Sequence, residues 1–228
     1  MATILQIETA TPVCSVAISI NGETIAIKEE KAPNIHAASL TLFIDEAMKM
    51  ANLTYADLDA IAVSKGPGSY TGLRIGVSTA KGLCFALDKP LIAINTLKMM
   101  ANGYLWQHPN FGGLVCPMID ARRMEVFTAV FDHHLAEVEN THAKIVDEKS
   151  FSIELQNHYM AFVGDGAEKC AAVIDEPNAH FNSENFNSAG NMSNLAFAAY
   201  QTKSFEDVAY FEPFYLKDFV LTTPKKKV

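Results

Sequence analysis

The opening of the chain predicts a three-stranded antiparallel meander. Residues 14–20 alternate between apolar and small polar side chains, as expected for a strand that buries one face. Asn21-Gly22 follows directly, and this pair favours a two-residue hairpin turn. The segments Thr3–Glu8 and 23–28 are rich in β-branched and apolar residues and predict the first and third strands. The N-terminal part of the fold is therefore built on a β-sheet.

Helices and buried strands alternate after this meander. Residues 35–51 and 71–87 carry apolar side chains at helical spacing, and Thr96–Gln107 predicts a third helix. The short apolar runs 60–63 and 91–94 are typical of parallel strands buried on both faces. The resulting order, β-β-β-α-β-α-β-α, is that of a ribonuclease H-like domain.

The second half repeats this order less clearly. Leu114–Asp120, 126–131 and 143–146 predict another meander, and Pro117 suggests a bulge or an edge position for its first strand. A helix, a strand and two helices follow, at residues 150–158, Met160–Val163, 167–174 and 193–202. We therefore expect an α/β protein of two ribonuclease H-like domains, the second smaller or degenerate.

The boundary between the two domains is expected near residues 107–113, where a proline and two glycines cluster. This predicts an N-terminal domain at residues 1–108 and a C-terminal domain at 109–228. The last helix of the second domain is expected to pack back on the first.

Cysteine usage and hydropathy indicate a cytoplasmic protein. Cys14, Cys84, Cys116 and Cys170 lie among apolar neighbours and form no C-x-x-C pair, so we expect four buried, reduced thiols. No apolar run approaches the ~18 residues of a membrane span. No basic region followed by an apolar stretch opens the chain, so no signal peptide is expected.

The charge balance argues against a protein that grips nucleic acid alone. Acidic residues exceed basic ones by 26 to 18, for a net charge of −8. Proteins that bind nucleic acid gain affinity by placing Lys and Arg on phosphates, and the chain has no basic stripe with interleaved aromatic residues. Its basic run, Lys225-Lys226-Lys227, predicts a solvated tail.

A Gly-rich segment, K-G-P-G-S-Y-T-G-L-R-I-G at residues 65–76, joins a buried strand to a helix. Amides at such a helix start can bind an anion, which makes Gly66 and Gly68 candidate nucleotide contacts. A tight turn that brings helix and strand together is the alternative, and physical grounds alone favour it. The segment lacks the Gly-Lys-Ser/Thr of a P-loop, and Thr71 replaces the third glycine of G-x-G-x-x-G.

Two strand ends offer further candidates for a phosphate site. Glu8 and Thr9 end the first strand, and Asp120 takes the matching place in the second half. If both loops faced one cleft, they would form a phosphate clamp, although a glutamate at a strand end is more often a solvated rim residue. No H-x-x-x-H, H-E-x-x-H or G-x-S-x-G pattern occurs, so we assign no catalytic residue, metal ligand or cofactor.

Several of these segments resemble the TsaB (YeaZ) family. The similar stretches are Ile4 to Thr11 with Cys14 to Ala17, the segment 65–76, the run I-D-A-R-R-M-E-V-F at 119–127 and Pro213-Phe214-Tyr215-Leu216. The likeness is strong over residues 1–127 and thin from about 135 to 205. That family belongs to the actin-like ATPase superfamily and has two ribonuclease H-like domains.

The resemblance implies a non-catalytic partner in tRNA modification. Family members help to make threonylcarbamoyladenosine, 3′ of the anticodon, in tRNAs that read codons beginning with A. A sister protein, TsaD, carries the metal and transfers the threonylcarbamoyl group; TsaB pairs with it, and the small ATPase TsaE joins them. The resemblance thus implies that this protein binds tRNA only indirectly, through the complex. Glu8 departs from the Asp that many members carry, and TsaD's metal-binding histidine pair has no counterpart here.

Other functions remain open at this point. Glu8, the Gly66 loop and Asp120 also fit an ATP-dependent kinase of the same superfamily, which would need an adenosine-binding loop such as Gly164-Asp165-Gly166. A glycoprotease-like hydrolase is a third alternative, without a metal or nucleophile motif to support it. Whether the free chain is a monomer or a homodimer is also open.

By resemblance, the first two helices form the joint with TsaD. Both predicted helices have more apolar surface than one sheet can cover, and an exposed apolar patch usually marks an interaction site. The alternative is that other parts of this chain cover them. The candidate partner-binding residues are Leu40, Phe43, Ala47, Met50, Gly72, Leu73, Gly76, Val77, Thr79, Ala80, Leu83 and Cys84.

Overall fold

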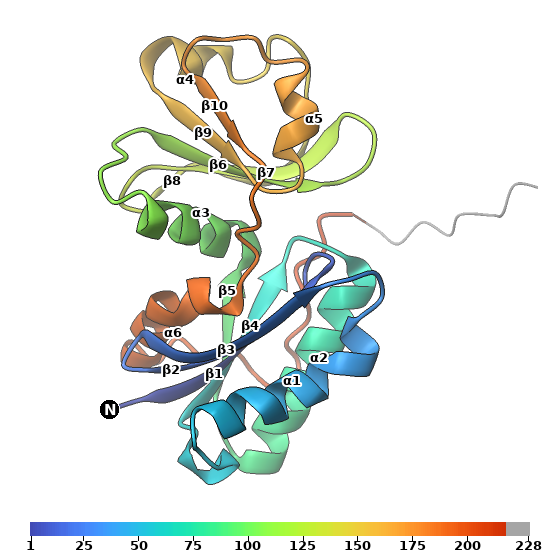
Figure 1. Cartoon of the computed structure of the whole chain (residues 1–228), viewed down its shortest axis with the longest axis vertical. Helices are drawn as coiled ribbons and strands as arrows, with labels where there is room; N and C mark the ends of the chain where they lie inside the picture. The colour runs from blue at the N-terminus through green and yellow to red at the C-terminus, as the bar shows by residue number, and fades with distance from the viewer. Residues whose placement is uncertain (218–228) are drawn as a thin grey trace, which may run out of the picture.

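The computed structural model describes residues 1–217, which form two five-stranded sheets flanked by helices (Figure 1). The first sheet has the order β3-β2-β1-β4-β5. Its strands are β1 (Thr3–Glu8), β2 (Val13–Ile20), β3 (Glu23–Lys31), β4 (Ala60–Gly66) and β5 (Leu91–Asn95). The meander β1–β3 is antiparallel, whereas β4 and β5 run parallel to β1.

The second sheet repeats this arrangement, with the order β10-β9-β6-β7-β8. Its strands are β6 (Leu114–Asp120), β7 (Glu125–Phe131), β8 (Glu137–Ile145), β9 (Met160–Val163) and β10 (Ala179–Asn182). Each sheet is thus a meander extended by two parallel strands, which confirms the predicted fold of two ribonuclease H-like halves. The strand β10 was not predicted from the sequence. The boundary placed at residue 108 stays a prediction.

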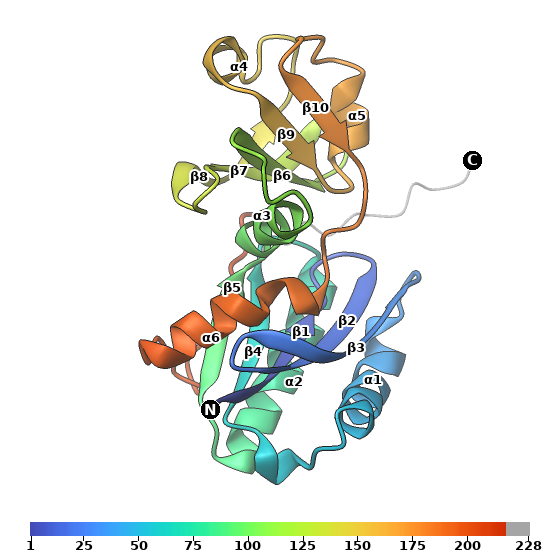
Figure 2. The ribbon, with the colours of Figure 1, turned by 60° about the vertical axis from the view of Figure 1, so that its left-hand side comes forward.

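Helices cover both faces of each sheet. On the outer face of the first sheet, α1 (His36–Met50) and α2 (Tyr70–Leu87) lie side by side. The helix α3 (Thr96–Gln107), the 3₁₀ helix η2 (Ala189–Met192) and the helix α6 (Ser193–Gln201) share one apolar cluster with both sheets. Figure 2 shows α3 between the two sheets and α6 along the first sheet. The remaining helices are η1 (Tyr55–Asp57), α4 (Ser152–Asn157) and α5 (Ala167–Ala171), which is shorter than the predicted helix.

One apolar core joins the two halves. Ile4 and Ile92 of the first sheet, Met100 of α3, and Phe131 and Val163 of the second sheet belong to the same buried cluster. The helix α6 packs on β1, β2, β3 and β5, although it follows the second sheet in the chain. The halves therefore share part of the interior that stabilises each of them.

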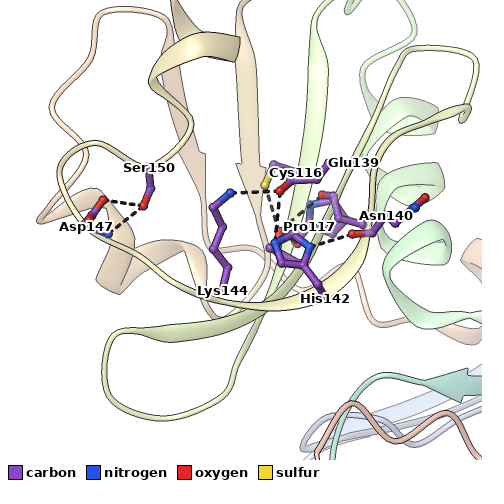
Figure 3. A network of polar contacts seen from close by, with 10 residues as sticks. Cys116, Pro117, Glu139, Asn140, His142, Lys144, Asp147 and Ser150 are labelled. Carbon is purple, nitrogen blue, oxygen red and sulfur yellow. Dashed lines mark hydrogen bonds and ion pairs between the residues drawn. The ribbon is translucent and has the colours of Figure 1, made fainter.

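The strand β6 is central in its sheet, so the expectation of an edge position at Pro117 is wrong. Proline has no N–H to donate, and such residues are normally confined to edges or bulges. Here Thr128 of the neighbouring β7 donates a side-chain hydrogen bond of 2.9 Å to the carbonyl oxygen of Pro117. Figure 3 shows Cys116 and Pro117 next to polar side chains of β8, among them Glu139 and Lys144, which form an ion pair of 3.1 Å.

Two further expectations concern thiols and membranes. All four cysteines are buried and free, as predicted. None of the helices within residues 1–217 combines the length and hydropathy needed to cross a membrane. The Lys225-Lys226-Lys227 run lies outside the described residues.

Candidate functional site

The Gly-rich loop leaves the end of β4 and leads into α2. Gly66 has a φ of +112°, and a Cβ at this position would lie 2.5 Å from the carbonyl oxygen of Phe214. The N–H of Phe214 in turn donates a hydrogen bond of 2.7 Å to the carbonyl oxygen of Lys65. The family-like C-terminal segment therefore folds back onto this loop.

Backbone donors of the loop are used within the chain. The N–H of Gly66 donates to Oγ1 of Thr96 at 3.1 Å, and that of Ser69 donates to the carbonyl oxygen of Ala10 at 2.6 Å. A Cβ at Gly68 would lie 2.4 Å from the same carbonyl oxygen. The glycines thus permit close approach between the loop, the end of β1 and the C-terminal segment. This geometry favours the tight-turn interpretation over an anion cradle.

Glu8 is fully buried, so the expectation of a solvated rim residue is wrong. The following residue explains this burial, because the hydroxyl of Thr9 donates a hydrogen bond of 2.8 Å to the carbonyl oxygen of Gly72. A Cβ at Gly72 or Gly76 would lie 2.0 or 2.2 Å from an oxygen of Thr9. The two glycines therefore let α2 close over the end of β1.

Burial also perturbs the Glu8 carboxyl group. Desolvation raises its pKa from 4.5 to about 7, although the N–H of Ala10 and the hydroxyl of Ser64 act to lower it. Oε1 of Glu8 accepts the Ala10 N–H at 2.5 Å. Among the described residues, Oε2 of Glu8 and Oγ of Ser64 are buried without a well-formed hydrogen bond. The carboxyl group is thus a neutral or half-ionised interior group near neutral pH.

Asp120 lies in a separate polar cluster of the second half. Its Oδ1 contacts Nζ of Lys169 and accepts the N–H of Arg122 at 2.9 Å, and its own N–H donates to Asp165 at 3.0 Å. Partial burial raises the pKa of Asp120, but the contacts with Lys169 and Arg122 outweigh it and lower the net value. Glu8 and Asp120 are each held within their own half and share no hydrogen-bond partner among the described residues.

A small hollow that the sequence did not indicate lies where α1 and α2 begin. It has a volume of about 300 Å³, and Thr11, His36, Ser69 and Ile75 contribute to its lining. Nε2 of His36 lies 2.8 Å from the carbonyl oxygen of Thr11. Burial lowers the pKa of His36, against the effect of this hydrogen bond. His36 therefore fastens the start of α1 to the β1–β2 loop.

Most of the candidate partner-binding residues lie inside the chain. Met50 is 60% exposed, and Thr79 and Leu83 are half-buried. The other nine are buried, namely Leu40, Phe43, Ala47, Gly72, Leu73, Gly76, Val77, Ala80 and Cys84. The candidate set leaves out Leu42, which is 59% exposed on α1, and Ile75, which is half-buried one turn before Thr79.

The chain itself covers the far side of α2. Nζ of Lys81 donates to the carbonyl oxygens of Phe211 at 2.9 Å and of Ala209 at 3.2 Å. Val208 and Phe211 pack against the same apolar cluster as the buried stripe of α2. Apolar surface remains on both helices, including Met50 of α1 and Phe85 of α2. The α1/α2 outer face is defined here as Leu42, Ile75, Thr79 and Leu83.

The described residues offer no obvious metal centre. Within residues 1–217, no group of three or more His, Cys, Asp or Glu side chains is placed to hold a metal ion.

The family model for "TsaD: tRNA N6-adenosine threonylcarbamoyltransferase" matches residues 23–226. The chain belongs to this family. Within the family, the chain is similar to proteins named TsaB and YeaZ. It is also 38% identical, over 40% of its length and 32% of that protein, to a protein of Staphylococcus saprophyticus named "tRNA N6-adenosine threonylcarbamoyltransferase".

Curated TsaB proteins match this chain over about half of their length. The TsaB of Escherichia coli K12, named a "tRNA threonylcarbamoyladenosine biosynthesis protein", is 37% identical over 128 residues, which are 56% of this chain and 54% of that protein. The TsaB of Bacillus subtilis 168 is 35% identical over 132 residues, 58% of this chain and 56% of that protein. The chain thus aligns with about half the length of the curated relatives it matches.

Solved structures share the fold. "YeaZ from Pseudomonas aeruginosa" has a TM-score of 0.81 at 24% identity, covering 95% of this chain and all of that one. An activator of 2-hydroxyisocaproyl-CoA dehydratase from Clostridium difficile, solved with bound ADPNP, has a TM-score of 0.53 at 11% identity, covering 90% of this chain and 98% of that one. These likenesses show that the chain shares its fold with YeaZ and with the dehydratase activator.

Proposed function

We propose that this chain is the non-catalytic partner that binds and activates TsaD in threonylcarbamoyladenosine biosynthesis. The group is transferred to the adenosine 3′ of the anticodon in tRNAs that read codons beginning with A. TsaE joins the pair in a ternary complex, and the tRNA is met through the assembly, in the cytoplasm. The names of the TsaB relatives support the pathway.

The observation that carries this proposal is the α1/α2 outer face. Leu42 is 59% exposed, and Ile75, Thr79 and Leu83 follow one another at four-residue spacing along α2. Residues at this spacing share one side of a helix. A helix pair of a partner could bury this side, because Gly82 leaves open space beside it. Apolar burial of this kind is the main driving force of most protein association.

The packing around the Gly66 loop supports a partner role over a kinase role. A kinase needs free backbone donors where the phosphates bind. Here the N–H of Gly66 is hydrogen-bonded to Thr96, and that of Ser69 is hydrogen-bonded to Ala10. Phe214 lies against Gly66 and donates to the carbonyl oxygen of Lys65. Glu8, which a metal-nucleotide would need to reach, is buried beneath the Thr9–Gly72 contact.

The test is reconstitution with single components left out. Purified chain is combined with TsaD, TsaE, a threonylcarbamoyl-AMP synthase and unmodified tRNA, and modified adenosine is measured by mass spectrometry of digested tRNA. We expect modification in the full mixture and none when either this chain or TsaD is omitted. Transfer by this chain without TsaD would contradict the non-catalytic role, and full transfer without this chain would contradict the activating role.

A further inference from the structure

Two adjacent arginines form an unusual turn between β6 and β7. Arg122 has a φ of +70° and Arg123 a φ of +52°. Left-handed backbone conformations are adopted readily by Gly and Asn, but they are unfavourable for a long side chain such as Arg. Both residues are exposed, so packing of the side chains does not explain their presence. An arginine pair at these positions therefore points to a role outside the folded chain.

Hydrogen bonds with Lys169 and Asp120 fix the backbone of this turn. Nζ of Lys169 donates to the carbonyl oxygens of Arg123 at 2.7 Å and Glu125 at 2.6 Å, and it also contacts Asp120. The N–H of Arg122 is fixed by Asp120 at 2.9 Å. These contacts use the backbone and leave the side chains free. Neither guanidinium group forms an ion pair or a hydrogen bond with another described residue.

Lysines and acidic groups balance one another around the turn, although the chain as a whole carries a net charge of −8. Lys217, the last described residue, contacts the carboxylate of Glu125. Burial raises the pKa of Asp165, while the charges of Lys31 and Lys169 oppose that rise, so Lys31 of the first half also faces this cluster. The acidic groups here are thus already neutralised by lysines, and the two arginines keep their charge available.

We propose that Arg122 and Arg123 bind phosphate groups of the RNA backbone when the complex takes up tRNA. A guanidinium group offers paired N–H donors that match a phosphate, and a preformed turn reduces the entropy lost on binding. We choose RNA as the partner because its backbone carries phosphates along its whole length. Two neighbouring guanidinium groups can therefore each bind a phosphate at the same time. This inference rests on the proposed function.

A double variant can remove the arginines without harming the turn. Arg122→Asn with Arg123→Gly places the two residue types that tolerate a positive φ best at these positions. The thermal midpoint of the variant should equal or exceed that of the parent chain. Lys203→Gly is the matched control, because Lys203 is also exposed, basic and at a positive φ of +53°, after α6.

Binding of tRNA to the reconstituted complex with TsaD and TsaE is then measured at several salt concentrations. We expect the double variant to assemble normally, to weaken tRNA binding by about tenfold and to lower the salt slope by roughly 2. The Lys203→Gly complex should match the parent. A correctly assembled variant with unchanged affinity and slope would overturn the inference, as would a variant that fails to assemble, since the arginines would then bind protein. If the parent chain itself assembles no complex, the proposed function fails, and this inference fails with it.

Discussion

The N–H of Phe214 donates a hydrogen bond of 2.7 Å to the carbonyl oxygen of Lys65, which fastens the C-terminal segment to the Gly-rich loop. The contact joins two stretches that are far apart in the sequence and that both resemble the TsaB (YeaZ) family. Tyr215 extends it, because its ring lies 4.7 Å from that of Tyr70 at the start of α2. Close packing between the two segments explains why the loop needs glycine.

Substitution of Gly66 should destabilise the fold. In Gly66→Ala, the new Cβ would collide with the carbonyl oxygen of Phe214 at 2.5 Å, and a φ of +112° is strained for alanine. We expect a loss of about 2–4 kcal/mol in the free energy of unfolding, measured by urea denaturation. Gly82→Ala is the control: a Cβ there meets no described atom within 4 Å, so stability should rise by up to about 1 kcal/mol. Equal effects of the two substitutions would contradict this packing.

An arginine on the α1/α2 outer face should block binding to TsaD. In Thr79→Arg, the half-buried site lets the side chain reach water in the free chain, whereas a partner would bury the charge unpaired. We expect circular dichroism like that of the parent and about 100-fold weaker TsaD binding, measured by gel filtration and titration. Thr202→Arg makes the same change at an exposed site after α6, away from α1 and α2; it is the control and should bind normally.

The substitutions Ala47→Arg and Ala80→Arg are unsuitable for the same test. Both alanines have 0% exposure, so either change would bury a charge in the core and unfold the chain. A folded Thr79→Arg variant that still binds TsaD at full strength would show that the joint lies elsewhere.

Stability should fall between pH 5 and pH 8 because of Glu8. Its folded pKa of about 7 exceeds the ordinary 4.5, so the folded chain retains a proton that the unfolded chain releases. The contribution is fully present below pH 4.5 and is lost as pH rises through 7, by about 3 kcal/mol in total. Glu8→Gln should therefore match the parent at pH 5 and be more stable at pH 8 in urea denaturation. Glu148→Gln, at an exposed site, is the control; if it changes the profile as much as Glu8→Gln, burial of Glu8 is not the cause.

Binding of ATP to the isolated chain should be weak or absent. The amides of Gly66 and Ser69 are hydrogen-bonded to Thr96 and Ala10, and Phe214 lies against the loop. Isothermal titration calorimetry with Mg-ATP should detect no site tighter than about 100 μM, which corresponds to less than ~6 kcal/mol of binding free energy. A micromolar site would favour the kinase alternative instead.

Local sequence patterns predicted most strands of the two sheets. They failed where contacts with distant segments determine the position or burial of a residue. Alternation and the Asn21-Gly22 turn identified the first meander, because strand periodicity and hairpin turns are local properties. The four-residue β10 carries no such pattern, since its sequence A-H-F-N has a single large apolar side chain. Pro117 misled because the position of β6 in the sheet is set by its pairing with the distant strands β7 and β9, which the local sequence does not show.

The candidate site shows the same division. Helical spacing correctly revealed two apolar stripes on α2, but it could not show that Phe211 and Val208 cover one side of that helix. Nine of the twelve proposed partner contacts are buried, because the sheet and the C-terminal segment together cover most of both helices. Likewise, nothing adjacent to Glu8 in the sequence indicates its burial, which depends on Gly72 and Gly76, more than sixty residues away.

The core shared by the two halves has a mechanical consequence. Met99 and Met100 of α3 are fully buried in the same cluster as Phe131 of the second sheet and Ile4 of the first. Separating the two halves would expose these side chains to water. The free-energy cost of this exposure grows with the apolar area uncovered. We therefore expect the two halves to move together as one rigid body. A displacement of the α1/α2 outer face would then displace the arginine turn as well.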